Sequence, residues 1–431
     1  MRLLVVVLLG MVAGGLCPAL ASSAAESWPR SAVRPRVDLD GAWDFRMDPG
    51  AVGERDGWFR RGATFPDRIQ VPGSWDAQGF GDPTDKVYHN YVGKAWYRRH
   101  VAIPREFAGK RAILHVGAVH RSAKVWVNGH HVGGHIGYVT PFEIDVTDQV
   151  RPGRTALLII QVDSAQDWEI DTLTGCVDLI DYMFVNWGGI WHHVWLEARD
   201  TTCIDNSFVK PDVARSVASV EVELTNQGSR ASRTLVVEAL HPDGDRAGRT
   251  ETIVTLEPGT TSASVDVPVS SPKLWSPNHP HLYRIRASLL DGDRLIDQWE
   301  DRFGMRTIEI RGSDIYLNGN KTFLHGYGDD CVFPKTLCPP ADHAEYRARF
   351  SLAKQFGFNY VRHHSHIPLP EYFDMADELG LLIQPELPIA YEPYFDRARG
   401  KPAALQLYRD TWEGAIRNLR NHPSHQTHRI L

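Results

Sequence analysis

The chain has 431 residues, of which 42% are hydrophobic and 23% are charged, and these proportions are ordinary for a folded globular protein. Such a length is enough for roughly two to four domains with separate cores. The formal net charge of -6 provides no basic surface for a phosphate backbone, which excludes nucleic acid as a partner.

The N-terminal segment has the pattern of a secretory signal peptide. Arg2 precedes an apolar run over residues 3–16, and the small residues Ala19 and Ala21 follow. We therefore expect residues 1–21 to be cleaved and the protein to be exported to the periplasm or the extracellular space, without further contact with a membrane. A membrane anchor is the alternative, but the apolar run is short for a bilayer span and is interrupted by adjacent glycines.

Removal of such a leader leaves an even number of cysteines, which are Cys176, Cys203, Cys331 and Cys338. An even number is compatible with disulfide bonds in an oxidising compartment. A local bridge between Cys331 and Cys338 is one arrangement, and the sequence leaves the pairing open. No Cys-x-x-Cys pair is present, which argues against a structural zinc site.

The region from residue 30 to residue 200 is predicted to be an all-β domain, because short runs of β-forming residues alternate with turn residues. Its size indicates a jelly-roll sandwich. Strands are expected at residues 112–117, 124–127, 141–146, 156–162 and 193–197. The dipeptide Asn128-Gly129 predicts a two-residue hairpin after the second of these strands, since both residues tolerate the positive φ angles of a type I′ turn.

Residues 201–305 are predicted to form a second β-sandwich, of the immunoglobulin-like type. Apolar and polar residues alternate at 218–224 and at 264–267, as they do in strands with one buried face. The region also has the length of a seven-strand sandwich, about 100 residues.

The periodicity changes after residue 306, where the first helix of the chain is predicted. Asp342 is suited to cap this helix, with Glu345 reaching back to the cap, and Gly357 ends it. The apolar residues expected on one face of the helix are Tyr346, Phe350, Ala353 and Phe356.

Helices and strands are predicted to alternate through residues 306–431. Strands are expected at 322–327, 359–362 and 381–384, a second helix begins at Pro370, and a third covers 403–419. This alternation predicts a parallel α/β domain that corresponds to the first half of a TIM (β/α)8 barrel. The predicted fold class is therefore multidomain β plus α/β.

Polar side chains follow each of the three predicted parallel strands. They are Asp329 and Asp330 after the first strand, Arg362, His364 and His366 after the second, and Glu386 after the third. Because functional side chains of a parallel α/β domain gather at the carboxyl ends of its strands, we expect these residues to share one polar pocket.

Two other interpretations of these residues stay open. Arg362 could simply pair with Glu386 beneath the rim of the sheet. His363, His364 and His366 invite a metal site, but alternate side chains of a strand point to opposite faces, so the three cannot all face one ion. We expect neither a metal nor a cofactor.

Several short motifs follow one another along the mature chain. They are Leu39-Asp40-Gly41-Ala42-Trp43, Val71-Pro72-Gly73-Ser74-Trp75, Ala95-Trp96-Tyr97-Arg98-Arg99, Val125-Trp126-Val127-Asn128-Gly129, Gly188-Gly189-Ile190-Trp191, Leu274-Trp275-Ser276-Pro277, Phe303-Gly304-Met305-Arg306, Leu317-Asn318-Gly319-Asn320 and Asn359-Tyr360-Val361-Arg362. In this order they resemble glycoside hydrolase family 2, the group of β-galactosidases, β-glucuronidases and β-mannosidases. Each motif is weak alone, but their shared order is specific.

The resemblance implies an enzyme that hydrolyses β-linked sugars with retention of configuration, and a carbohydrate as the partner. It assigns the six strand-end residues to substrate binding, and it leaves self-association of the chain undecided. The segment His325-Gly326-Tyr327-Gly328-Asp329-Asp330 departs from the Arg-Gly-x-Asn-x-His-Glu pattern that is usual in the family. The resemblance therefore does not specify the sugar.

Retaining glycosidases need one carboxylic acid to protonate the leaving oxygen and a second carboxylate to trap the sugar. In the family, Asn-His-Pro-Ser precedes an apolar strand that leads to the acid/base glutamate. Here Asn421-His422-Pro423-Ser424 is followed by the polar residues 425–429 and the sequence stops at Leu431. We therefore expect no catalytic residue within the chain, and an exposed sheet edge after the third parallel strand.

Three hypotheses follow from the sequence. The first is an exported glycoside hydrolase of the family 2 type, in a truncated form that is inactive alone. The second is a carbohydrate-binding protein that acts through residues 22–305 without catalysis. The third is an inert product of a frameshift or of a fragmentary gene.

Overall fold

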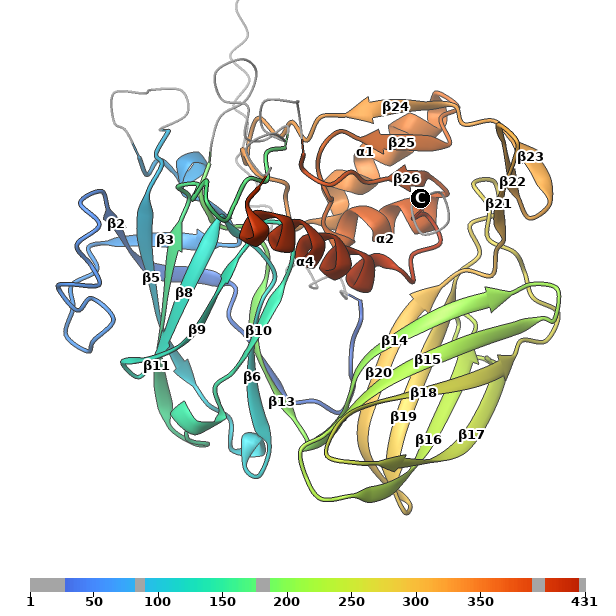
Figure 1. The fold of residues 1–431 in the computed structure, drawn as a ribbon, viewed down its shortest axis with the longest axis horizontal. Helices are drawn as coiled ribbons and strands as arrows, with labels where there is room; N and C mark the ends of the chain where they lie inside the picture. The colour runs from blue at the N-terminus through green and yellow to red at the C-terminus, as the bar shows by residue number, and fades with distance from the viewer. Residues whose placement is uncertain (1–27, 82–89, 176–186, 390–399, 426–431) are drawn as a thin grey trace, which may run out of the picture.

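The computed structural model describes residues 28–81, 90–175, 187–389 and 400–425, which form three modules (Figure 1). The first 21 residues, where the signal peptide is predicted, lie outside these ranges. None of the helices within the described ranges is both long and apolar enough to cross a bilayer.

The N-terminal sandwich consists of two antiparallel sheets with a shared core. In one sheet the strand order is β1 (Arg36–Asp38), β13 (Val194–Arg199), β6 (Arg111–Val116) and β10 (Phe142–Asp145). In the other it is β3 (Asp67–Val71), β2 (Gly41–Asp48), β5 (Lys94–Ala102), β11 (Thr155–Asp163), β8 (Ser122–Val127) and β9 (His130–Ile136). A short third sheet contains β4 (Gly73–Ser74), β12 (Gly189–Ile190) and β7 (Val119–His120). The strands expected in this region are confirmed.

The predicted two-residue turn joins β8 to β9. Asn128 and Gly129 have φ angles of 51° and 87°, in the positive region that this kind of hairpin requires. The side chain of Asn128 also accepts a hydrogen bond from Leu157 N at 2.9 Å and donates one to Gln149 O at 2.7 Å. The turn is thereby fixed to the neighbouring strand β11.

The middle sandwich contains seven described strands in two sheets. The order in the first sheet is β14 (Thr202–Asp212), β15 (Val217–Asn226) and β18 (Gly259–Pro268). The order in the second is β17 (Arg246–Leu256), β16 (Ala231–Leu240), β19 (Tyr283–Asp291) and β20 (Arg294–Phe303). Alternate residues of β15 are buried, because one face of this strand packs on the core, as the sequence pattern predicts.

The α/β module follows a small antiparallel sheet of β21 (Ile308–Arg311), β22 (Asp314–Leu317) and β23 (Asn320–Thr322). Its parallel strands are β24 (Gly326–Asp329), β25 (Tyr360–His363) and β26 (Leu382–Gln384), and its helices are α1 (His343–Gln355), α2 (Pro370–Leu379) and α4 (Pro402–Leu419). The first parallel strand therefore begins at Gly326 and not at Thr322, because Thr322 pairs with Ile315 in the preceding hairpin.

Helix α1 is capped as predicted, but two details of the prediction are wrong. The side chain of Asp342 accepts a hydrogen bond from Ala344 N. Glu345 accepts one from Arg349 Nε at 3.0 Å, one helical turn away, and not from the cap. Phe356 is 69% exposed, since it lies after the last helical turn and beyond the buried face.

Helix α2 ends at Gly380, as predicted, in a close contact with the middle sandwich. Gly380 has a φ angle of 75°, and a Cβ atom at this position would lie 2.3 Å from Pro277 O. Lys354 Nζ donates hydrogen bonds to both Pro277 O and Gly380 O, at 2.8 and 3.0 Å. Glycine is therefore required here for its backbone conformation and for space.

The edge of β26 is partly paired, which corrects the expectation of an open edge after the third strand. Ile383 N donates a hydrogen bond to Ser424 O at 2.8 Å, and Ile383 forms a parallel bridge with His425. The segment after α4 therefore lies beside β26, where a fourth parallel strand of the sheet would begin.

The local disulfide bridge between Cys331 and Cys338 is not formed, because Cys338 is a buried free thiol. Burial raises the pKa of this thiol to about 12, so it stays protonated at neutral pH. Cys203 is also a buried free thiol, and Cys176 lies outside the described residues.

Helix α2 buries three carboxylates, and each is paired with another part of the chain. Glu371 contacts His192, before β13. Asp374 binds Arg302 of β20, and it also lies 3.0 Å from Nε2 of His343. The third, Asp377, is described below.

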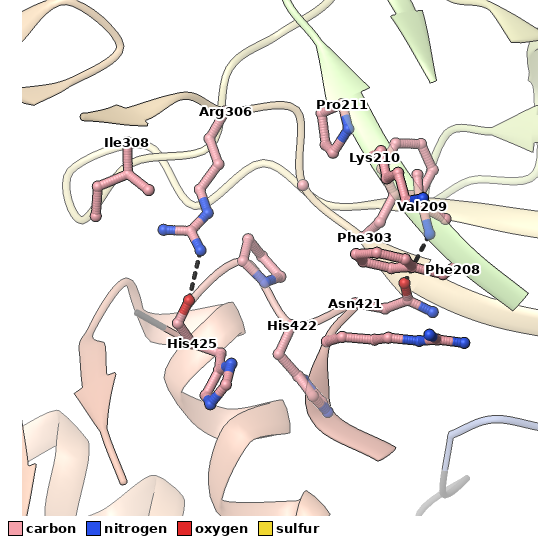
Figure 2. Close-up of a pocket in the computed structure, with 13 residues that line it drawn as sticks. Phe208, Val209, Lys210, Pro211, Phe303, Arg306, Ile308, Asn421, His422 and His425 are labelled. Carbon is pink, nitrogen blue, oxygen red and sulfur yellow. Dashed lines mark hydrogen bonds between the residues drawn. The ribbon is translucent and has the colours of Figure 1, made fainter. Parts of the chain in front are cut away.

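The predicted Asn-His-Pro-Ser segment connects the α/β module to the middle sandwich (Figure 2). The side chain of Asn421 accepts a hydrogen bond from Val209 N at 2.9 Å and donates to Ser207 O and Asp301 Oδ2, at 2.9 and 2.7 Å. These contacts border a small cavity of about 80 Å³. Arg306 Nη2 closes the other side of it with a 2.6 Å hydrogen bond to His425 O.

The adjacent residues of this segment bind the last buried carboxylate of α2. Asp377 Oδ2 lies 2.6 Å from His422 Nδ1, and Asp377 Oδ1 accepts a hydrogen bond from Ser424 N at 2.9 Å. Trp275 Nε1 of the middle sandwich donates to Asp377 O at 2.9 Å. Burial alone would lower the pKa of His422, but Asp377 raises it above its ordinary value.

Asn421→Ala is expected to lower the free energy of unfolding by about 2–4 kcal/mol, because it removes three hydrogen bonds and leaves buried partners unsatisfied. Urea unfolding followed by tryptophan fluorescence measures this loss. Asn418→Ala is the matched control, since Asn418 is exposed on α4 and should change stability little. Equal effects of the two substitutions would contradict the assigned role.

The His422–Asp377 contact predicts a pH-dependent stability. A histidine whose folded pKa is raised contributes stability below its unfolded pKa of about 6.5, and this contribution is lost as pH rises through the folded value. The gap in thermal midpoint between the native chain and His422→Gln should therefore narrow from pH 6 toward pH 9. His130→Gln, at an exposed site on β9, is the control. A gap that stays constant with pH would disprove this coupling.

Candidate active site

The predicted strand-end residues come together at one edge of the parallel sheet. Asp329 pairs in register with His363, and Arg362 pairs with Gln384 of β26. His364 N donates a hydrogen bond to Asp329 O at 2.9 Å, which joins the end of β24 to the end of β25. Glu386 N donates to His366 O at 3.2 Å, which brings in the segment after β26.

Arg362 and Glu386 form the ion pair that the sequence left as an alternative. Arg362 Nε and Nη2 donate to the two carboxylate oxygens of Glu386 at 2.6 and 2.9 Å, in the two-point geometry that suits a guanidinium. Glu386 Oε2 also accepts a hydrogen bond from Ser365 N at 2.9 Å. The Arg362 side chain is 47% exposed, so the pair lies at the surface of the cluster and is not buried beneath it.

Asp329 is held as a hydrogen-bond acceptor. Its Oδ2 accepts from the Tyr372 hydroxyl at 3.1 Å and its Oδ1 accepts from Cys331 N at 2.9 Å. Burial raises the pKa of Tyr372 well above its ordinary value, which keeps the hydroxyl available as a donor. Asp330, in contrast, is exposed.

Two of the three neighbouring histidines pack together, since the ring centroids of His363 and His366 lie 5.3 Å apart. His363 is buried against the ring of Tyr372, with centroids 5.0 Å apart, and burial lowers its pKa, although Asp329 acts in the opposite direction. His364 is half-buried, and its Nδ1 lies 2.8 Å from Ser365 Oγ. His366 is fully buried.

The N-terminal sandwich contributes residues that sequence reasoning missed. Tyr138 and Trp191 both lie near His366, each with a ring centroid 6.3 Å from the imidazole. Trp191 belongs to the Gly188-Gly189-Ile190-Trp191 motif, and this motif was the only feature of the sequence that pointed to a role for Trp191. One of the predicted substrate residues, His366, therefore meets aromatic side chains of another module.

A loop of the N-terminal sandwich also reaches the strand ends. Thr174 N donates to Pro388 O at 2.7 Å, and Thr174 forms a parallel bridge with Ile389. Gly175 follows directly, and a Cβ atom there would lie only 2.4 Å from Ser365 O. This close approach places the loop against the strand-end cluster.

The arrangement is suited to recognition of a polar ligand. Asp330 and Arg362 offer exposed charged groups that can hydrogen-bond to hydroxyl or carboxylate groups. Asp329 and Glu386 are already engaged by donors of the chain, so their oxygens fix the shape of the cluster. Tyr138 and Trp191 of the N-terminal sandwich are fully buried, so they support the packing of His366 and present no open ring face.

Sequence comparisons agree with the division of the first part of the chain into two β-sandwiches. Residues 37–199 match the sugar binding domain of glycosyl hydrolases family 2, and residues 202–306 match a second domain of glycosyl hydrolases family 2. These two matches define a multidomain chain of the glycosyl hydrolase class, in which the sugar binding domain comes first. The chain belongs to glycosyl hydrolases family 2, which confirms the resemblance seen in the motifs.

Named relatives are glycosidases. A beta-glucuronidase of Paenibacillus borealis is 27% identical over 420 residues, which cover 91% of this chain and 66% of that protein. A beta-galactosidase of Thermoanaerobacter pseudethanolicus is 30% identical over 303 residues, covering 69% of this chain and 40% of that protein. The chain thus spans at most about two thirds of the length of these relatives.

The fold is shared with solved structures. A β-glucuronidase from Ruminococcus gnavus in complex with D-glucuronic acid has a TM-score of 0.76 and 24% identity, and the match covers 91% of this chain and 65% of that one. A family 2 member from Bacteroides cellulosilyticus has a TM-score of 0.73 and 25% identity, covering 90% of this chain and 52% of that one.

Gly175→Ala is expected to lower the free energy of unfolding by about 1–3 kcal/mol, because the added methyl group overlaps Ser365 O. Differential scanning calorimetry measures the effect. Gly50→Ala is the control, since a Cβ there meets only Val52 at an ordinary distance of 3.4 Å. If Gly175→Ala is as stable as Gly50→Ala, the loop does not pack as described.

Proposed function

We propose that this chain is the sugar-recognition part of a retaining glycoside hydrolase that acts on β-linked sugars. The observation that carries the proposal is the cluster of polar strand-end residues beside aromatic residues of the sugar binding domain, within a family 2 architecture. Since residues 1–21 have the pattern of a signal peptide, the proposed site of action lies outside the cytoplasm.

The described carboxylates are assigned to binding and not to bond cleavage. Retaining hydrolysis needs a proton donor and a free nucleophilic carboxylate about 5–5.5 Å apart. Asp329 and Glu386 are held in place by hydrogen bonds from other groups of the chain, which suits carboxylates that orient a ligand. We infer that residues in the described ranges orient the substrate and that they do not hydrolyse it by themselves.

The relatives indicate two sugars to test first. Two of the four similar proteins named above are β-glucuronidases and one is a β-galactosidase. The exposed guanidinium of Arg362 is a suitable partner for the carboxylate of a glucuronide, if it exchanges part of its pairing with Glu386. A β-glucuronide is therefore our first candidate ligand, and a β-galactoside the second.

Asp330→Asn is expected to weaken binding of phenyl β-D-glucuronide about tenfold, because it removes one charged hydrogen-bond acceptor at the strand ends. Isothermal titration calorimetry with the full chain measures the affinity, and methyl β-D-galactoside serves as the second ligand. Asp314→Asn is the control, since Asp314 pairs with Lys321 on the separate β22–β23 hairpin and should leave the affinity unchanged.

Two results would reject this proposal. One is the absence of binding to either sugar by the purified chain. The other is hydrolysis of 4-nitrophenyl β-D-glucuronide or β-D-galactoside that Asp330→Asn or Glu386→Gln abolishes, since these residues would then take part in the chemistry.

A further inference from the structure

A second cluster of ionisable side chains lies between the N-terminal sandwich and helix α2, outside the strand-end cluster. His192 and His193 directly precede β13, and Glu371 is in the first turn of α2. His192 Nε2 lies 3.0 and 3.1 Å from the two carboxylate oxygens of Glu371. His193 Nε2 lies 3.5 Å from one of the same oxygens. Both imidazoles therefore direct Nε2 toward a single carboxylate.

The distances suit a metal ion. One donor atom from each of His192, His193 and Glu371 can be chosen so that all three lie within 4.8 Å of one another. A tetrahedral ion with bonds of about 2.0–2.1 Å holds its ligand atoms about 3.3 Å apart. Small rotations of the side chains would therefore bring the three donors to coordination distance.

Asp40 holds the imidazole of His193 in place through its other ring nitrogen. Its Oδ2 lies 2.5 Å from His193 Nδ1, and its Oδ1 accepts a hydrogen bond from Val194 N at 3.0 Å. When Nδ1–H donates to a carboxylate, the lone pair remains on Nε2, which is the usual support of a metal-binding histidine. The orientation of His193 is thus fixed by a group that does not itself contact the ion.

A cavity gives access to the cluster. His192, His193 and Glu371 all line a cavity of about 550 Å³ at the junction of the three modules. This volume has room for a water molecule as a fourth ligand. Four arginines that line the same cavity are paired with other carboxylates, as Arg34 is with Asp297 at 2.7 Å, and the fifth, Arg36, lies over the ring of Trp195. Burial alone would lower the pKa of His193, but the carboxylates of Asp40 and Glu371 raise it to about 10, so a divalent cation that binds here must displace a proton from this imidazole.

We propose that His192, His193 and Glu371 bind one divalent transition-metal ion, with Zn²⁺ as the best fit, and that this ion ties the N-terminal sandwich to helix α2. Two imidazoles and one carboxylate favour Zn²⁺, whereas Mg²⁺ and Ca²⁺ prefer ligand sets made of oxygen. The ion replaces protons shared between the imidazoles and the carboxylates, and these protons pass to solvent.

Calorimetric titration of the untagged full chain with Zn²⁺, after dialysis against a chelator, tests the proposal. We expect one equivalent of Zn²⁺ to bind, and no comparable binding of Mg²⁺. His192→Gln should weaken Zn²⁺ binding at least tenfold, and Asp40→Asn should weaken it about 10–100-fold through the loss of orientation. His130→Gln is the matched control, because His130 belongs to a second His-His pair, is exposed and contacts no carboxylate in the described structure.

A spectroscopic measurement keeps the proposal open to disproof if a variant is unstable. Co²⁺ bound to the native chain should show the visible absorption of a four-coordinate ion with nitrogen and oxygen ligands, and His193→Gln should remove it. Absence of stoichiometric Zn²⁺ binding by the native chain would overturn the proposal. Equal loss of affinity in His130→Gln and His192→Gln would do so as well, since binding would then be unspecific.

Discussion

The pairing of buried carboxylates on helix α2 determines how the three modules are placed. A carboxylate removed from water must meet cations or N–H donors, and loss of a buried partner typically costs about 3–5 kcal/mol. Glu371, Asp374 and Asp377 are all buried on this one helix. Their partners come respectively from the N-terminal sandwich, from Arg302 of the middle sandwich and from the segment 421–424. No module can move relative to α2 without breaking at least one of these pairs.

This constraint explains why the strand-end cluster could be predicted only in part. The polar residues after β24, β25 and β26 were predictable, because parallel strands bring their carboxyl ends to one edge whatever surrounds them. The contacts of His366 with Tyr138 and Trp191 were not, since those residues approach one another only when two modules dock. The same holds for the His192–Glu371 contact, which joins residues 179 positions apart.

The elements themselves were predictable wherever their cause is local. Alternation in β15, the Asn128-Gly129 turn and the Asp342 cap each depend on a few neighbouring residues, and the structure confirms all three. Predictions were wrong where two local partners compete. Glu345 binds Arg349 on the next turn in preference to the cap, and Thr322 joins an antiparallel hairpin in preference to the parallel sheet.

The contact between Gly380 and Pro277 sets the distance between helix α2 and the middle sandwich, and this distance leaves no room for a Cβ atom at residue 380. The end of α2 rests on the backbone of the middle sandwich with no side chain between them, and Lys354 spans both carbonyl oxygens. Any residue larger than glycine would tilt the helix away from that surface and draw the carboxylates of Asp374 and Asp377 off their partners. Tolerance to substitution at this position is therefore set by the assembly of the modules, although the residue itself carries no functional group.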